Sequence, residues 1–157
     1  MIVSFKDKYA FLSNFYPCKV LYEGYVYPSS EHAFQAAKTD NLILREQIRN
    51  APTPSLAKSY GRQIPKRFFN ENWDIDRDGV MLRVLRAKFK NKQLAQRLRD
   101  TGEEELVETN TWNDVYWEVC LGKGENKLGK LLMRVREELN NSSSAKSAYR
   151  KAQEIRK

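Results

Sequence analysis

The chain has 157 residues, of which 41% are hydrophobic and 11% aromatic, enough for one domain that buries a core without metals or disulfides. It shows no apolar run of the roughly 18 residues that cross a bilayer and no secretion signal, so we expect a cytoplasmic protein with no membrane partner. Cys18, Cys120 and the sole histidine form no zinc-binding pattern, so we expect no metal site and no other cofactor, although carboxylates could still hold a hard cation such as magnesium. The formal charge is +8, but residues 140–157 carry five cations against one anion, and the +4 left for the body suits a phosphorylated substrate as well as a nucleic acid.

Short β-branched and aromatic runs near the N-terminus indicate strands. Residues 19–27 carry two such runs around Glu23-Gly24, which predicts a hairpin, and Ile2–Phe5 indicates another strand. Pro28 keeps its neighbourhood extended, and Ser29 or Ser30 then caps a helix that ends near Lys38.

Four helices are expected in the middle of the chain. Asp40 is expected to cap a helix that ends at Arg49. Thr53-Pro54-Ser55 combines a cap with a first-turn proline, and Gly61 is expected to stop that helix so that Arg62 emerges just past it. Apolar residues at helical spacing predict further helices over 77–90 and 92–99.

The C-terminal part is expected to hold one more helix and a tail. Leu106-Val107 predicts a short strand before an aromatic loop over residues 109–120. Asn126 or a neighbour opens a helix that ends near residue 139. The polar run 140–146 is typical of an unpacked linker, and residues 145–157 of a frayed helix.

The helix predicted to start near residue 30 carries a polar stripe. Glu31, Gln35 and Lys38 share one face at positions i, i+4 and i+7. One interpretation is that Glu31 and Lys38 only complement the helix dipole, each by about 0.3–1 kcal/mol. The other is that Glu31 is a reactive carboxylate, and composition alone favours the first.

The loop around Asp114 is too aromatic for a plain solvated connector. Trp112, Tyr116 and Trp117 could stack on a planar base, or these rings could simply cap the core. The turn over residues 122–126 could offer backbone N–H groups to an anion, although its spacing matches neither a Walker A loop nor a dinucleotide-binding motif.

Several tracts in a fixed order resemble the YbiA-like (NADAR) family. They are Phe11-Leu-Ser-Asn-Phe-Tyr-Pro17, Tyr27-Pro-Ser-Ser-Glu-His-Ala-Phe-Gln-Ala-Ala-Lys38, Ala57–Arg62, Trp73 with Arg77 and Met81, Lys88-Phe89, Leu106–Glu108, Asp114 with Trp117, and Gly124–Met133. The resemblance covers roughly residues 9–139 and departs from the family pattern at Glu118, where glycine is expected. It implies a single compact α+β domain over residues 1–139, predominantly α-helical with a few short β-strands, followed by a basic, flexible or partly helical tail over 140–157.

The resemblance also implies an enzyme, an N-glycosidase that hydrolyses the bond between a ribose and a nitrogen base. One branch of the family acts on phosphorylated ribosylamino-pyrimidine intermediates of riboflavin biosynthesis, and another removes ADP-ribose from guanine bases of nucleic acid. Its partner would accordingly be a small phosphorylated ribosyl substrate or an ADP-ribosylated nucleic acid.

Such a reaction needs a carboxylate near the anomeric carbon, a clamp for the base and an anchor for phosphate. The resemblance implies that Glu31 stabilises the charged ribose or activates water and that Asp114 orients water or substrate, or that these roles are exchanged. The implied substrate-binding residues are Phe11, Asn14, Ser30, Lys38, Arg62, Trp73, Trp117 and Asn126. Among them, the aromatic rings would stack on the base, the asparagines would bond its edge or the ribose, and the cations would attract phosphate.

Two other functions stay open at this point. A non-catalytic ADP-ribose or nucleic-acid binding module would keep the cleft without cutting. Alternatively, Arg83, Arg86, Lys90 and Lys92 would form a nucleic-acid footprint, although long cationic side chains on the outer side of a helix usually mark solvated surface.

Overall fold

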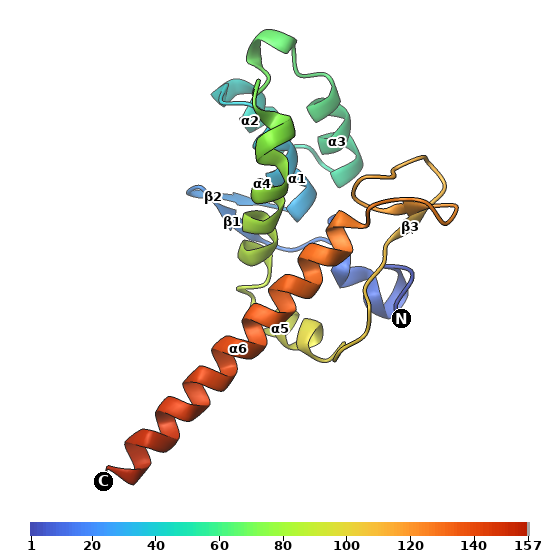
Figure 1. Ribbon diagram of the computed structural model, residues 1–157. Helices are drawn as coiled ribbons and strands as arrows, with labels where there is room; N and C mark the ends of the chain where they lie inside the picture. The colour runs from blue at the N-terminus through green and yellow to red at the C-terminus, as the bar shows by residue number, and fades with distance from the viewer. Residues whose placement is uncertain (157) are drawn as a thin grey trace.

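The protein folds as one α+β domain in which helices dominate (Figure 1). The structure is a computed structural model and describes residues 1–156. Its elements in order are η1 (Asp7–Leu12), β1 (Val20–Tyr22), β2 (Tyr25–Tyr27), α1 (Ser30–Ala36), α2 (Leu42–Arg49), α3 (Pro54–Arg62), η2 (Lys66–Phe68), α4 (Trp73–Lys88), α5 (Lys92–Arg99), β3 (Thr109–Asn110), β4 (Val119–Cys120) and α6 (Lys127–Ile155), where η marks a 3-10 helix. This confirms the expected fold class.

Helix α4 forms the centre of the core. It contacts α1, α6 and strand β1, and α1 in turn packs against α2 and α3 (Figure 1). The buried residues of α4 include Val80, Met81, Val84 and Leu85, which recur at helical spacing and so face several neighbouring elements at once. The helix therefore links the N-terminal part that carries α1 to the C-terminal helix α6.

The hairpin and the caps follow local sequence rules. Strands β1 and β2 pair antiparallel around Glu23-Gly24 as expected, and Ser29 caps α1 by accepting a hydrogen bond from the backbone N–H of His32 at 3.2 Å. The cap of α2 is Asn41, whose Oδ1 accepts from Leu44 N at 3.0 Å, so the expectation of Asp40 was one residue early. Both residue types cap helices, so composition did not separate them.

Helix α3 corrects the expected role of Gly61. The helix continues through Arg62, so Gly61 lies inside it and does not stop it. A Cβ at Gly61 would lie 1.9 Å from Oε1 of Gln35 on α1. Glycine is thus needed because two helices approach closely, and Arg62 belongs to the exposed side of the last turn.

The chain ends show two further differences from expectation. Ile2 and Leu106 form only an isolated parallel bridge, so neither belongs to a regular strand. Helix α6 runs without a break through the tract expected to be a linker, since residues 130–156 contain no glycine or proline to end it. Its described side chains beyond residue 139 are exposed, and in Figure 1 this part projects from the body. Lys157 lies outside the described residues.

No helix among residues 1–156 is both long and apolar enough to cross a membrane.

Candidate active site

Glu31 is a buried carboxylate at the start of α1. Its residue is 7% exposed, and its backbone N–H donates to the carbonyl oxygen of Asn14 at 3.0 Å. Its Oε1 accepts a hydrogen bond from Nε2 of Gln35 at 2.7 Å. Burial raises the pKa of Glu31 above its ordinary value, while the Gln35 hydrogen bond opposes that rise. A buried carboxylate with a raised pKa is typical of a group that exchanges protons in a reaction.

Three cations surround this carboxylate. Lys58, Lys38 and Arg62 each lower the pKa of Glu31 and so partly oppose the effect of burial. In return, burial lowers the pKa of Lys38 below its ordinary value, and the charge of Glu31 opposes this shift. The site therefore combines one anion with an excess of positive charge, which suits a phosphorylated ligand.

Lys58 was missed as a site residue in the sequence. It stands four residues before Arg62 on α3, so the two share one helix face, and this spacing was the available signal. Its Nζ also lies 6.0 Å from the ring centroid of Phe15, which is 42% exposed. Lys58 of α3 therefore lies near both Glu31 of α1 and Phe15 in the segment after η1.

Gln35 fixes the position of Glu31 and is itself fixed by α3. It is 3% exposed and packs directly onto Gly61. While Nε2 serves Glu31, Oε1 is buried without a hydrogen-bond partner among the described residues. An unsatisfied buried amide oxygen destabilises the fold by about 1–3 kcal/mol. The packing of α1 against α3 must therefore hold Gln35 in this orientation.

Aromatic rings form a wall beside the cations. The Phe34 ring centroid lies 5.1 Å from that of Trp73 and 5.4 Å from that of Trp117. Nζ of Lys38 lies 5.8 Å from the Phe34 centroid and 5.9 Å from the Trp73 centroid. Trp73 also lines a groove of about 1200 Å³ along residues 66–74, so free space adjoins the wall.

Asp114 organises the aromatic loop between β3 and β4. Its Oδ1 accepts hydrogen bonds from the backbone N–H groups of Tyr116 at 3.0 Å and Trp117 at 2.9 Å. Nδ2 of Asn110 donates to the Asp114 carbonyl oxygen at 2.9 Å. These bonds give Asp114 a conformational role, and its role in orienting water or substrate stays a prediction.

The ring of Tyr116 is anchored to two helices. Its hydroxyl donates to Oδ1 of Asp78 on α4, and Nζ of Lys127 on α6 donates to Oδ2 of the same carboxylate at 3.1 Å. The guanidinium carbon of Arg77 lies 3.5 Å from the Tyr116 ring centroid. Because Tyr116 packs edge-on against Trp117, with centroids 4.8 Å apart, this cluster holds the loop side of the aromatic wall.

Glu118 is a second perturbed carboxylate on the same loop. Its Oε2 is buried and has no hydrogen-bond partner among the described residues. Burial raises the pKa of Glu118 to about 7, with the charges of Asp114 and Glu108 adding to the rise and Lys58 opposing it. Lys58 thus acts electrostatically on both Glu31 and Glu118, which links the loop to α1.

The structure separates the remaining predicted ligand residues into two groups. Asn14 and Ser30 lie next to Glu31, but their side chains bond each other, with Oγ of Ser30 donating to Oδ1 of Asn14 at 2.8 Å. Asn126 lies at the start of α6, and its Nδ2 donates to the Leu106 carbonyl oxygen at 2.9 Å. Its Oδ1 is buried without a partner among residues 1–156.

The expected stacking role of Phe11 is not supported. Helix η1 turns Phe11 into the core, where it is 2% exposed and Arg97 covers its ring at 4.3 Å. It is Asn14 and Phe15 that bring this tract to Glu31 and Lys58. Phe15 is therefore the exposed ring that this tract brings near Lys58, and the stacking role of Phe11 stays a prediction.

Two buried titratable residues near the site have structural partners. His32 bonds Oγ of Ser29 through Nδ1 at 2.6 Å and the Ala51 carbonyl oxygen through Nε2 at 2.9 Å. Lys88 is fully buried, donates from Nζ to the Ser13 carbonyl oxygen at 2.8 Å, and has its pKa lowered by burial to about 8. Among residues 1–156, no group of three or more histidine, cysteine or acidic side chains is placed to hold a metal ion.

Comparisons with known proteins agree with these features. A family model of the NADAR domain matches residues 3–140. The chain is 41% identical to N-glycosidase YbiA of Escherichia coli over 138 residues, which are 87% of this chain and 85% of that protein. It is 38% identical over 135 residues to riboflavin biosynthesis protein VVA0006 of Vibrio vulnificus, covering 85% of this chain but only 36% of that protein. The NMR structure of the Escherichia coli protein YbiA matches 91% of this chain and 87% of that chain with a TM-score of 0.80 and 37% identity.

Proposed function

The chain belongs to the NADAR domain family, and on this premise we propose that it is an N-glycosidase that hydrolyses the bond between a ribose and a nitrogen base. The substrate is a phosphorylated ribosylamino-pyrimidine intermediate of riboflavin biosynthesis or, alternatively, ADP-ribosylated guanine. A relative named for riboflavin biosynthesis supports the first of these. The observation that carries the proposal is the buried Glu31, held by Gln35 and surrounded by three cations.

Glu31 is the group we assign to the reacting sugar. Cleavage of the ribosyl bond builds positive charge on the ribose, and a nearby carboxylate stabilises that charge or takes a proton from the attacking water. Because burial raises its pKa, the ionised form of Glu31 is a stronger proton acceptor than an ordinary solvent-exposed carboxylate. Gln35 restricts Glu31 to one orientation, which lowers the entropic cost of reaching the reactive geometry.

The surroundings of Glu31 supply the other two requirements. Trp117 is the partly exposed ring of the aromatic wall and the one on which the base stacks, while the buried Phe34 and Trp73 support it from the core side. Lys38, Lys58 and Arg62 attract the phosphate, with Arg62 the most exposed of the three and therefore the first that an incoming ligand meets. Asn14 and Ser30 bond each other beside Glu31, Asn126 is held at the start of α6 by the Leu106 carbonyl oxygen, and Asp114 keeps the loop in place.

Glu118 is the residue we assign to choice of base. Its Oε2 is buried and unpartnered, so it can accept a hydrogen bond from an amino or ring N–H group of a ligand once movement of the loop uncovers it. Guanine carries an exocyclic amino group that only donates. A base that lacks such donors would leave the carboxylate oxygen unsatisfied, at a cost of about 1–3 kcal/mol.

Product analysis with both substrate classes tests the proposal. The protein is incubated with the ribosylamino-pyrimidine phosphate and with ADP-ribosylated guanine nucleic acid, and released base or ADP-ribose is measured. We expect turnover of at least one of them, reduced by about two decades or more in Glu31→Gln because a positioned acid or base contributes typically 10²–10⁴-fold. The exposed carboxylate change Glu137→Gln is the matched control and should leave the rate unchanged.

Each outcome has a defined meaning. Near-wild-type hydrolysis by a folded Glu31→Gln protein would remove Glu31 from the catalytic role. Stoichiometric binding of either substrate without turnover would instead support a non-catalytic ADP-ribose or nucleic-acid binding module. Thermal unfolding curves of both variants establish whether they fold.

A further inference from the structure

A second concave surface lies on the other side of the fold from the loop that carries Asp114. Helices α4, α5 and α6 enclose a groove of about 610 Å³. Its polar lining consists mainly of cations and hydroxyls, namely Arg86, Lys90, Lys92, Arg99, Lys146, Ser142 and Ser143. None of these residues belongs to α1, α3 or the aromatic loop, so the surface is distinct from the Glu31 site.

The groove has positive charge that its own acid does not neutralise. Glu138 is the acidic residue in the lining, and it is already paired with Arg86 at 2.7 Å. Within the part of the chain that the structure describes, Lys90, Lys92 and Lys146 form no ion pair and are exposed. Three free ammonium groups therefore face one concave region, where a low-dielectric wall concentrates their field.

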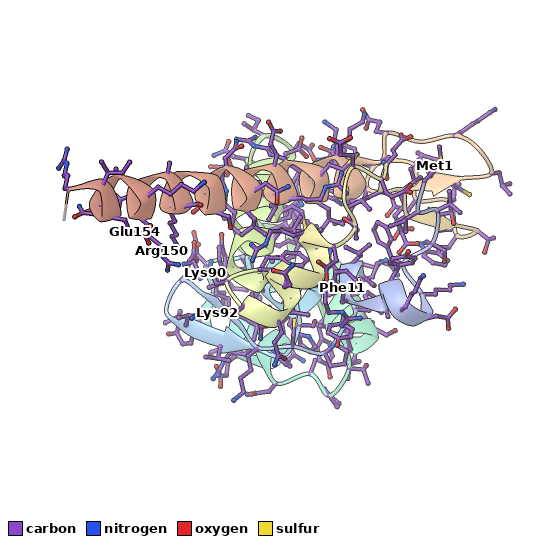
Figure 2. The ribbon with its side chains drawn as sticks, turned by 90° about the horizontal axis from the view of Figure 1, so that it is seen from below. Met1, Phe11, Lys90, Lys92, Arg150 and Glu154 are labelled. Atoms are coloured by element: carbon purple, nitrogen blue, oxygen red, sulfur yellow. The ribbon has the colours of Figure 1, made fainter. Side chains whose placement is uncertain are left out.

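The projecting part of α6 extends this charge beyond the body. Arg150 follows Lys146 by four residues and so lies on the same helix face, about 6 Å further along the axis. Figure 2 shows Arg150 on the side of α6 that faces Lys90 and Lys92. Glu154 follows one turn later, so an acid comes next after Lys146 and Arg150 on this face of the helix.

We propose that this groove and the adjoining face of α6 bind the phosphate backbone of a nucleic acid. Ammonium, guanidinium and hydroxyl groups are the donors that contact phosphate oxygens, and the lining supplies all three. Phe89 and Val135 of the lining are buried, so the groove itself offers little apolar surface for insertion into an acidic membrane, which is the alternative that the vesicle measurement below tests. The contacts are to phosphate, so binding is independent of base sequence.

Binding of the protein to a fluorescent DNA duplex of arbitrary sequence tests this proposal. Anisotropy is measured over a series of salt concentrations for the wild type and for the triple variant Lys90→Gln, Lys92→Gln and Lys146→Gln. Each phosphate contact adds about 0.9 to the slope of log affinity against log salt, so three lost contacts should reduce that slope by about 2.7. At about 100 mM salt we expect at least a tenfold loss of affinity.

The matched control removes the same number of charges elsewhere. Lys6, Lys8 and Lys19 are exposed and lie before α1, and their triple change to glutamine should alter the slope far less. Equal effects of the two triple variants, or no duplex binding by the wild type, would overturn the proposal. Stronger loss of binding to phosphatidylserine vesicles than to DNA in the groove variant would assign the surface to membranes instead. Unchanged hydrolysis of a small ribosyl substrate by the groove variant is the expected sign that this surface acts separately from Glu31.

Discussion

The contact between Gly61 and Gln35 offers a way to disturb Glu31 without changing any polar residue. In Gly61→Ala the new methyl group would lie 1.9 Å from Oε1 and 2.8 Å from Cδ of Gln35, closer than atoms approach. The end of Gln35 must therefore move, and Nε2 then leaves its position 2.7 Å from Glu31 Oε1. Helix α3 itself accepts alanine, which is favoured over glycine by about 1 kcal/mol in a helix interior.

The expected magnitude follows from the lost hydrogen bond. Hydrogen bonds to charged groups contribute about 1.5–3 kcal/mol, which corresponds to about 10- to 150-fold in rate when the ionised carboxylate is required. The Gln35 hydrogen bond lowers the pKa of Glu31, so its loss raises that pKa further. The acid limb of the pH–rate profile should therefore move to higher pH, and part of the lost activity should return as the pH increases.

Steady-state hydrolysis across a pH series measures both effects, with Gly79→Ala as the matched control. At Gly79, also within a helix, the new Cβ would meet only the flexible end of Arg83 at 3.3 Å, so activity and pH profile should stay unchanged. Gln35→Leu should reproduce the Gly61→Ala profile, and the double variant should be no worse than either one. A Gly61→Ala protein with wild-type turnover and an unshifted acid limb would refute the reasoning.

The loop carboxylates give two further predictions. Asp114→Asn keeps an acceptor for the N–H groups of Tyr116 and Trp117, so this variant should retain activity within a few-fold. Asp114→Ala removes that acceptor and should lose affinity for substrate. A loss of 100-fold or more in kcat for Asp114→Asn would show that Asp114 has a direct chemical role. For Glu118, the folded-state pKa of about 7 lies above the ordinary 4.5, so its stabilising contribution is present at low pH and is lost as the pH rises through about 7. Glu118→Gln should therefore show a smaller fall in Tm between about pH 5 and pH 8 than the wild type, and equal falls in both proteins would contradict the assignment.

Most helices were predictable because their signals are local. The caps Ser29 and Thr53 bond backbone groups only three residues ahead, and the apolar stripe of α4 is visible within its own segment. Helix α6 was underestimated because a polar, serine-rich tract was taken as a sign of a linker, although nothing in it breaks a helix. The role of Gly61 was predicted wrongly because the side chain that requires a glycine there, Gln35, lies on another helix, 26 positions away in sequence.

The candidate site was predictable where its residues share one helix. Glu31 and Gln35 lie on α1 as their spacing indicated, and Gln35 does bond Glu31. Lys38 lies in the turn just past the helix, which ends at Ala36 and not near Lys38 as expected. The anchoring of Tyr116 by Asp78 and Lys127 was not foreseen, because it joins α4, the loop and α6 through pairs 38 and 49 residues apart. Such pairs depend on tertiary packing, which no spacing rule describes.

The three tryptophans give the protein its own set of optical probes. Trp73 is buried in the aromatic wall, Trp117 is partly exposed beside it, and Trp112 is 61% exposed at the outer part of the loop. A soluble collisional quencher would therefore reach Trp112 first, while a planar ligand on the wall would change the emission of the inner pair. Loop movement and ligand binding can thus be followed separately in the unlabelled protein, with Trp112→Phe removing the outer signal.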